Sequence, residues 1–523
     1  MSKYFLLKIG LIMSLLVLLA AAARLSIIRH SYYKSLAIDN KLLENIISAP
    51  RGRILDRKGR VVALSLYQYA DGSLGDFKGY KFEGKDSAYT MKRKYPYENA
   101  MGLISGYVNK ANDVDIKNNR CGVKIDKEDM AGRGGVEENS DCGLRGRDGK
   151  RLIEVDARGA YVRELGREEP LNGKDVSLSI DAYWQDKVYK ILEGKKAIVI
   201  ISDPKTGEII VLVSSPSYNP NDFSFDKNDE MIKSYLGDNE NLPMLNRVIS
   251  GRYHPGSVFK PVMAVAGLES GVITNTTTYE DTGVIKIGEY SYNNWYWTQY
   301  GKKEGMVDIT KALQRSNDIF FYKLGEGLGV DRIKSWSEKF GYGKKTGVEL
   351  TGEVTGIVPD DKWKREVKGE RWFLGDTYHL AIGQGYLSVT PLQVNQMTNV
   401  IANDGKKCKM SILNPPAGGS KIECSDLKIN KNTINTIIEG MKRACKTGGT
   451  AYPLFGMKTE IACKTGTAEV GDGSDDTHAW LTAFAPVSDP EISITVMVER
   501  GGEGSEVAAP IVRDILKEWF EEN

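Results

Sequence analysis

The sequence feature that most constrains the fold is an apolar run close to the N-terminus. The segment IGLIMSLLVLLAAAA, residues 9–23, holds fifteen apolar or small residues in succession. That length lies between the apolar core of a signal peptide and a full membrane span. Apolar residues at 4–7 and 25–28 extend the run, and Lys8 can reach toward the lipid headgroups. We therefore expect residues 1–28 to form an uncleaved transmembrane anchor, with a signal peptide cleaved near AAA as the alternative.

Either interpretation exports the rest of the chain, because no second run of membrane length follows. Six cysteines fit an oxidising compartment. The sequence does not fix their pairing, and free buried thiols are the alternative to disulfides. The first pairs to consider join neighbouring cysteines: Cys121–Cys142, Cys408–Cys424 and Cys445–Cys463.

Composition argues against two classes of protein. The 523 residues carry 71 Lys+Arg against 69 Asp+Glu, a net charge of +2, so nucleic acid is not expected as the main partner. The four histidines show no HExxH or other metal-ligand spacing, so a zinc enzyme is not expected. The length is sufficient for two or three domains and at least one large core.

The chain changes character near Asp175. Before it, RGRIL and RVVALSL predict two short strands around the turn DRKG, and a Gly-, Arg- and Asp-rich tract predicts an extended strand-and-loop module. After it, Asp181 is expected to cap a helix, and two pairs of strands are expected in AIVIISDPKTGEIIVLVSS and in HAWLTAFAP with ISITVMVE. Together with the helix-like C-terminus, these patterns predict an α/β sandwich from residue 175 to the end.

Ser257 is the first candidate nucleophile. The pattern Ser-x-x-Lys, which places the two side chains on one face of a helix, starts at Ser31, Ser202, Ser224, Ser257 and Ser425. Only the copy formed by Ser257 and Lys260 opens a long apolar helix, which we expect to end near Gly271. A serine at a helix N-terminus lies near free N–H groups that suit an oxyanion. A serine that only caps this helix is the alternative.

Two further motifs favour the catalytic interpretation. Ser316, Asn317 and Asp318 interrupt a helical pattern, so they predict the end of one helix and the cap of the next. Lys-Thr-Gly occurs at 345–347, 446–448 and 464–466. Only the third copy lies in a strand pattern, where Lys464 and nearby hydroxyls offer a site for a substrate carboxylate.

In this order, Ser-x-x-Lys, Ser-x-Asp and Lys-Thr-Gly resemble the signature of the penicillin-binding and serine β-lactamase superfamily. RGRILDRKGR, GRGGVE, RYHPGSVFKP and GDTYHLAIGQGYLSVTPLQ are similar to segments of class B penicillin-binding proteins. Asp318 in place of asparagine is most similar to the elongation-specific penicillin-binding protein 2 group. The resemblance implies an α/β transpeptidase domain at 175–523, with an antiparallel sheet flanked by helices and an all-helical subdomain. It also implies a β-rich pedestal of the dimerisation type at 29–174.

The same resemblance implies a D,D-transpeptidase with no metal or organic cofactor. Ser257 would attack the carbonyl of the penultimate D-alanine of a cell-wall stem peptide, and Lys260 would take its proton. Ser316 would relay a proton, and Asp318 would hold Lys260.

The third motif would bind the substrate. Lys464, Thr465 and Thr467 would hold the terminal carboxylate, and Lys464 would also lower the pKa of Lys260. Gly466 would let the extended peptide come close. Backbone N–H groups of Ser257 and Thr467 would form the oxyanion hole.

The implied partners are D-Ala-D-Ala stem peptides, β-lactams, a SEDS-family glycosyltransferase and other elongation-complex membrane proteins. The implied location is the cytoplasmic membrane, with a single span and an extracytoplasmic catalytic domain. A division-specific class B protein, a β-lactamase and a non-catalytic sensor or scaffold are the alternatives. The deacylation pattern Glu-x-x-Leu-Asn of β-lactamases occurs only before Ser257, at residues 168–172, so we expect a long-lived acyl-enzyme. Cys463, directly before Lys464, suggests sensitivity to reductant as a hypothesis.

Overall fold

The structure, a computed structural model, describes residues 3–39, 41–68, 74–75, 90–118, 120–122, 125–156, 158, 161–415 and 423–521. It begins with three helical segments: α1 (Lys3–Ala23), η1 (Arg24–Ile28) and α2 (His30–Asp39). Within the described residues, Leu7–Ile28 is the one helical stretch that is long and apolar enough to cross a membrane, with 22 residues and a mean hydropathy of 2.4. At the helical rise it measures about 33 Å, which matches the hydrocarbon core of a bilayer. The length therefore suits the anchor predicted at residues 1–28.

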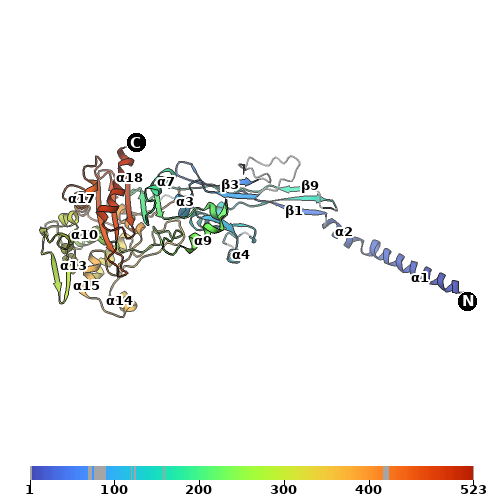
Figure 1. Ribbon diagram of the computed structural model, residues 1–523, viewed down its shortest axis with the longest axis horizontal. Coiled ribbons are helices and arrows are strands. Elements are labelled where there is room, and N and C mark those ends of the chain that lie inside the picture. The colour runs from blue at the N-terminus through green and yellow to red at the C-terminus, as the bar shows by residue number, and fades with distance from the viewer. Residues whose placement is uncertain are drawn as a thin grey trace. The chain divides into compact units, whose positions relative to one another are not determined.

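The chain divides into two compact units, residues 1–52 with 145–174 and residues 53–144 with 175–523. The first unit contains an antiparallel sheet in the order β1-β8-β9 (Figure 1). Its strands are β1 (Leu42–Ile47), β8 (Gly149–Val155) and β9 (Tyr161–Glu168). The functional division expected from the sequence, with its boundary at residue 174, remains a prediction.

The second unit begins with the predicted hairpin, in which Gly59 supplies the turn with a φ of +78°. Its sheet has the order β10-β2-β3-β4, and β5 also pairs with β3. The strands are β2 (Ile54–Leu55), β3 (Val61–Gln68), β4 (Leu74–Gly75), β5 (Thr90–Lys94) and β10 (Val176–Ser177). The Arg60 guanidinium pairs with Asp56 and Asp181, and Asp181 caps α7 (Ala182–Ile191) as predicted. These contacts attach the hairpin to the start of α7.

Short elements surround this sheet. They are α3 (Glu98–Ser105), β6 (Tyr107–Lys110), α4 (Asp113–Asn118), β7 (Met130–Arg133), α5 (Gly135–Asn139), α6 (Asp141–Leu144), α8 (Asn221–Ser224) and α9 (Asp229–Gly237). Arg93 and Glu137 form an ion pair of 2.8 Å whose two side chains are almost completely buried. Because breaking a buried ion pair is strongly destabilising, this pair constrains how β5 and α5 pack.

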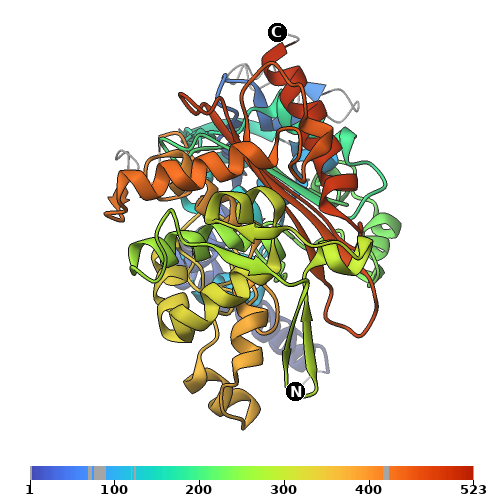
Figure 2. The ribbon, with the colours of Figure 1, turned by 90° about the vertical axis from the view of Figure 1, so that its left-hand side faces the viewer.

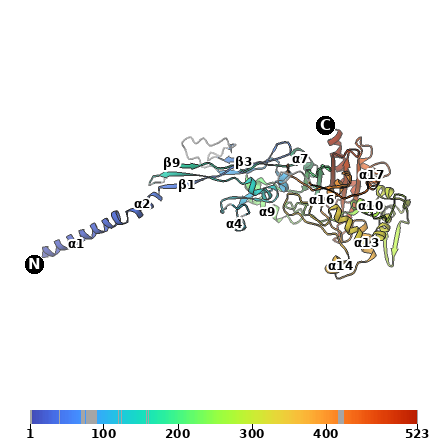
Figure 3. The same cartoon turned by 180° about the vertical axis from the view of Figure 1, so that it is seen from behind.

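The core of the second unit is a five-stranded antiparallel sheet in the order β12-β11-β21-β20-β19 (Figure 2). Its strands are β11 (Ala197–Ser202), β12 (Ile209–Ser215), β19 (Ala462–Glu469), β20 (Thr477–Ala485) and β21 (Ile492–Val498). All side chains of β11, β12 and β21 are buried, because helices cover both faces. On one face lie α7 and α18 (Ala509–Glu521), which follows η5 (Gly504–Ala508). On the other lie α16 (Pro391–Ala402) and η2 (Gly256–Phe259) (Figure 3). The predicted α/β sandwich is confirmed.

A helical part adjoins the sheet through α10 (Lys260–Glu269), which packs against α13 and α17. Its other helices are α12 (Ile309–Arg315), α13 (Asp318–Phe340), α14 (Asp361–Lys368), α15 (Leu374–Ala381) and α17 (Lys431–Ala444). This part also contains the helix α11 (Trp295–Tyr300). The part was predicted to be all-helical, but it carries two small sheets, β13 (Tyr279–Asp281) with β16 (Gly305–Val307) and β14 (Val284–Ile287) with β15 (Tyr290–Asn293). The remaining elements are β17 (Lys406–Cys408), β18 (Cys424–Asp426) and η4 (Tyr452–Leu454).

All six cysteines form disulfides, and the pairs are the three predicted from neighbouring positions. The alternative of free buried thiols is therefore wrong. Cys408–Cys424 joins the paired strands β17 and β18. Cys445–Cys463 joins the end of α17 to β19, one residue before Lys464.

Candidate active site

Ser257 lies in η2, where the central sheet meets the helical part. It is partly exposed, whereas the next three residues are buried, so the serine is the accessible residue of this turn. The predicted apolar helix is confirmed as η2 followed by α10, and Gly271 follows its end with a φ of +67°. Pro261 falls in the first turn of α10, where a missing N–H is tolerated. Ser257 therefore stands at the N-terminal end of a buried helix.

A segment distant in sequence fixes the backbone in front of Ser257. Gly256 N donates to Gly383 O at 2.9 Å, and Tyr253 exchanges two backbone hydrogen bonds with Val389. A Cβ on Gly383, whose φ is +78°, would lie 2.2 Å from Gly256 O. Only glycine allows this close approach. Sequence reasoning used this segment for its resemblance alone and did not assign it this supporting role.

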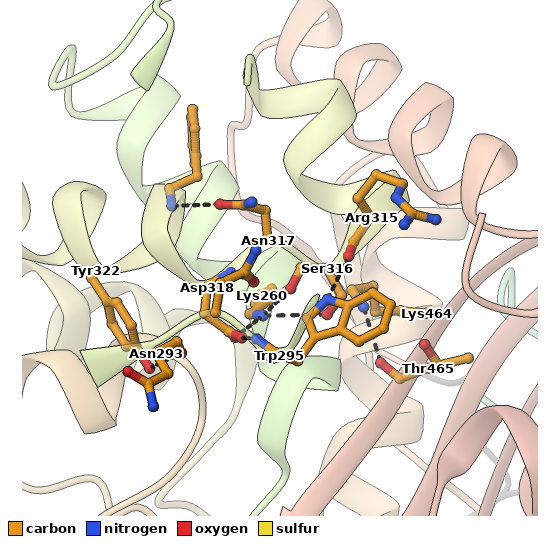
Figure 4. A network of polar contacts seen from close by, with 12 residues as sticks. Lys260, Asn293, Trp295, Arg315, Ser316, Asn317, Asp318, Tyr322, Lys464 and Thr465 are labelled. Carbon is orange, nitrogen blue, oxygen red and sulfur yellow. Dashed lines mark hydrogen bonds and ion pairs between the residues drawn. The ribbon is translucent and has the colours of Figure 1, made fainter. Parts of the chain in front are cut away.

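Lys260 is completely buried, and its ammonium group donates three hydrogen bonds (Figure 4). Nζ lies 2.8 Å from Ser316 O, 3.2 Å from Ser316 Oγ and 2.6 Å from Asp318 Oδ1. These are all the donors that a protonated lysine has. The first two motifs are thus brought together, with Lys260 ion-paired to Asp318 in the resting site.

The local fold of the second motif agrees with the sequence prediction. Ser316 ends α12 in the left-handed conformation with a φ of +55°, and the Asn317 side chain caps α13 by accepting from Phe320 N. Asp318 is the first residue of α13. The sharp change of direction turns both Ser316 and Asp318 toward Lys260.

Polar residues that sequence reasoning missed support this turn. Asp281 accepts hydrogen bonds from the side chains of Asn294 and Asn317 at 2.8 and 3.0 Å. Asn294 Oδ1 in turn accepts from Asp318 N, and Trp295 N donates to Asp318 Oδ2 at 3.0 Å. Both carboxylate oxygens of Asp318 are therefore engaged. Asp281 and Asn294 gave no sequence signal beyond that of ordinary turn residues.

The third motif lies on β19, as predicted, and Lys464 is completely buried. Lys464 Nζ donates to Thr465 O at 3.0 Å, and the Thr465 hydroxyl lies 2.7 Å from that of Thr450. The other two Lys-Thr-Gly copies begin with exposed lysines, Lys345 and Lys446. Neither offers a buried cation.

Burial shifts the pKa of both lysines downward. It lowers the pKa of Lys260, although the carboxylate of Asp318 opposes this shift. Burial and the nearby charge of Lys260 hold the pKa of Lys464 well below its usual range. The charge of Lys260 opposes a second charge on Lys464. The state in which both lysines are protonated is therefore disfavoured, and the site favours one neutral amine. A neutral lysine amine is the species that can accept a proton from a serine hydroxyl.

Gly466 has close protein neighbours. A Cβ there would lie 3.0 Å from Val258 Cγ1 and 3.2 Å from Pro255 O. The missing side chain therefore lets β19 pack against η2, next to Ser257. A Cβ on Gly256 would likewise meet Thr467 O at 2.8 Å, so the first and third motifs are in direct contact.

Comparisons with known proteins agree with this arrangement. Residues 197–517 match the family model of the penicillin binding protein transpeptidase domain, and residues 77–178 match that of the penicillin-binding protein dimerisation domain. The peptidoglycan D,D-transpeptidase MrdA of Salmonella typhimurium is 33% identical over an alignment of 478 residues, and the match covers 84% of this chain and 75% of the relative.

Solved structures are similar as well. The complex between penicillin-binding protein PBP2 and MreC from Helicobacter pylori contains a chain with a TM-score of 0.79 and 27% identity, covering 92% of this chain and 99% of that one. A peptidoglycan synthase complex that coordinates polymerization and crosslinking contains a chain with a TM-score of 0.79 and 28% identity, covering 100% of this chain and 99% of that one.

The fold and the three motifs define a penicillin-binding protein with a transpeptidase domain. Within that class, the chain belongs to the class B penicillin-binding proteins, and it is similar to relatives of the MrdA and PBP2 type.

Proposed function

We propose that this chain is a peptidoglycan D,D-transpeptidase of the elongation type, which cross-links stem peptides through an acyl-enzyme on Ser257. The observation that carries the proposal is the buried Lys260, bonded to Ser316 and Asp318 one helical turn from Ser257. The similarity to MrdA and PBP2 supports the elongation role.

Acylation proceeds through the neutral form of Lys260: its Nζ takes the proton of the Ser257 hydroxyl while Oγ attacks the carbonyl carbon of the penultimate D-alanine. The lowered pKa of Lys260 supports its role as the base. The N–H groups of Ser257 and Thr467 stabilise the oxyanion, and the contact between η2 and β19 supports this role.

Collapse of the tetrahedral intermediate breaks the peptide C–N bond and releases the terminal D-alanine. Its amine takes a proton from Lys260 through the Ser316 hydroxyl. An acceptor amine of a neighbouring stem peptide then attacks the ester carbonyl and loses a proton to the same lysine. As the new peptide bond forms and the ester C–Oγ bond breaks, Lys260 returns this proton to Oγ and restores Ser257. Water in place of the amine gives D,D-carboxypeptidase activity.

Lys464, Thr465 and Thr467 bind the terminal carboxylate of the donor peptide, on the strand that Gly466 holds against η2. The burial of Lys464 beside Lys260 supports this placement. β-Lactams carry a carboxylate and a reactive amide in a similar arrangement, so they acylate Ser257 as well.

The protein acts at the cytoplasmic membrane. Residues 1–28 form a single uncleaved span with a cytoplasmic N-terminus, and the apolar stretch Leu7–Ile28 supports this topology. Residues 29–174 form a pedestal that docks a SEDS-family glycosyltransferase and other elongation-complex membrane proteins, and residues 175–523 form the transpeptidase domain. Relatives solved with MreC and in a peptidoglycan synthase complex support such partners.

The test is D-alanine exchange on the full-length protein in detergent. A synthetic stem pentapeptide and a labelled D-amino acid are supplied, and release of D-alanine and incorporation of label are followed. We expect both activities in the wild type and in Ser425→Ala, which alters an exposed copy of the same sequence pattern. Ser257→Ala is expected to abolish both; activity that persists in this variant contradicts the proposal.

A further inference from the structure

The Thr467 hydroxyl, which is expected to bind the substrate carboxylate, is hydrogen-bonded to the carboxylate of Glu503. Thr467 Oγ1 donates to Glu503 Oε2 at 2.7 Å, and it accepts a hydrogen bond from Gly504 N at 3.3 Å. Glu503 precedes η5, in the loop that follows β21. The single hydrogen of the Thr467 hydroxyl is therefore already donated in the resting site.

The same carboxylate is held from the helical part. Gln299, an exposed residue of α11, donates from Nε2 to Glu503 Oε1 at 3.1 Å. The neighbouring residue Trp295 of α11 contacts Asp318. Glu503 thus links the third motif on β19 to the helix beside the second motif.

A hydroxyl has one hydrogen to donate. Thr467 can give it to Glu503 or to a ligand carboxylate, but not to both. If Glu503 remained in place, two carboxylates would compete for one donor at short range, where like charges repel strongly. A ligand that carries a carboxylate must therefore displace the Glu503 side chain.

We propose that Glu503 is an internal competitor for the carboxylate site: it occupies Thr467 in the resting enzyme, Gln299 holds it there, and the donor peptide or a β-lactam displaces it before Ser257 is acylated. This inference rests on the proposed function, because it takes Thr467 as a carboxylate-binding residue. The loop suits such a movement, since the half-buried Glu503 lies next to Gly502, whose φ is +83°.

The test measures the second-order rate constant for acylation of the full-length protein in detergent by a penicillin, followed by intact mass. Glu503→Gln keeps the size of the side chain and removes its charge. We expect it to raise the rate constant roughly tenfold, because a hydrogen bond to a charged group no longer has to be broken. Gln299→Ala is expected to give a smaller rise. Glu506→Gln, at an exposed glutamate of the adjoining η5, serves as the matched control and is expected to leave the rate unchanged.

A second probe separates competition from a general loosening of the loop. The methyl ester of the same penicillin has no carboxylate, so Glu503→Gln is expected to leave its rate constant unchanged. An equal gain with acid and ester overturns the inference, as does an unchanged or slower reaction with the acid. In both cases the wild type is still labelled on Ser257, so the proposed function stands. A wild type that takes no label overturns the proposed function and this inference together.

Discussion

Asp318→Asn tests how the site sets the basicity of Lys260. The Asp318 carboxylate accepts from Lys260 Nζ through Oδ1 at 2.6 Å and from Trp295 N through Oδ2 at 3.0 Å. An asparagine amide has one oxygen and one donor group, so one of these two hydrogen bonds is lost whichever way the amide lies. The substitution is isosteric, so the fold is expected to persist.

The direction of the effect follows from the two influences on Lys260. Burial lowers the pKa of Lys260, and Asp318 raises it. Removing the carboxylate leaves burial unopposed, so the pKa falls further and the neutral amine is populated at lower pH. A hydrogen bond to a charged group contributes about 1.5–3 kcal/mol, so its loss favours the neutral amine by roughly tenfold to a hundredfold.

The assay is the second-order rate constant for penicillin acylation of the full-length protein as a function of pH. The rising limb of the profile is expected to move to lower pH in Asp318→Asn, and the rate constant at a fixed pH on that limb is expected to rise by roughly tenfold or more. Asp331→Asn, an exposed position on the same helix, is the control and is expected to leave the profile in place. A limb that stays in place or moves to higher pH refutes the assignment of Lys260 as a base tuned by Asp318.

Three further perturbations test the frame around the site. Replacing Cys445 and Cys463 by serine opens a loop of 18 residues, so denaturant unfolding is expected to show that the free energy of unfolding falls by about 3 kcal/mol. Acylation is expected to become slower as well. Unchanged acylation would contradict a link between this disulfide and the Lys-Thr-Gly strand. Gly383→Ala places a methyl carbon 2.2 Å from a carbonyl oxygen of the nucleophile segment, so stopped-flow labelling is expected to show acylation slowed by at least roughly tenfold. Glu137→Ala breaks the buried ion pair with Arg93, and calorimetry is expected to show a loss of about 3–5 kcal/mol in the free energy of unfolding.

Sequence reasoning predicted the parts of the fold that local pattern determines. The hairpin around Gly59, the cap at Asp181, the buried strands and the helix after Ser257 all follow from turn chemistry and apolar runs, and each is confirmed. Neighbouring cysteines also paired as predicted, because short loops bring such residues together at little entropic cost.

The supporting residues could not be predicted in the same way. Asp281, Asn294, Gly383 and Glu503 lie far in sequence from the motifs they contact, and each resembles an ordinary turn or loop residue. Only the packing of the helical part against β19 and η2 gives them partners. Gly466 illustrates the same limit, because its contacts with Val258 and Pro255 depend on this packing.

The most direct test of the central claim is intact-mass labelling of the full-length protein with a penicillin, followed by peptide mapping. The account predicts one stable adduct, located on the peptide that contains Ser257, in the wild type and in Ser425→Ala. It predicts no adduct in Ser257→Ala. An adduct that persists in Ser257→Ala, or one that is lost within minutes of its formation by hydrolysis, would contradict it.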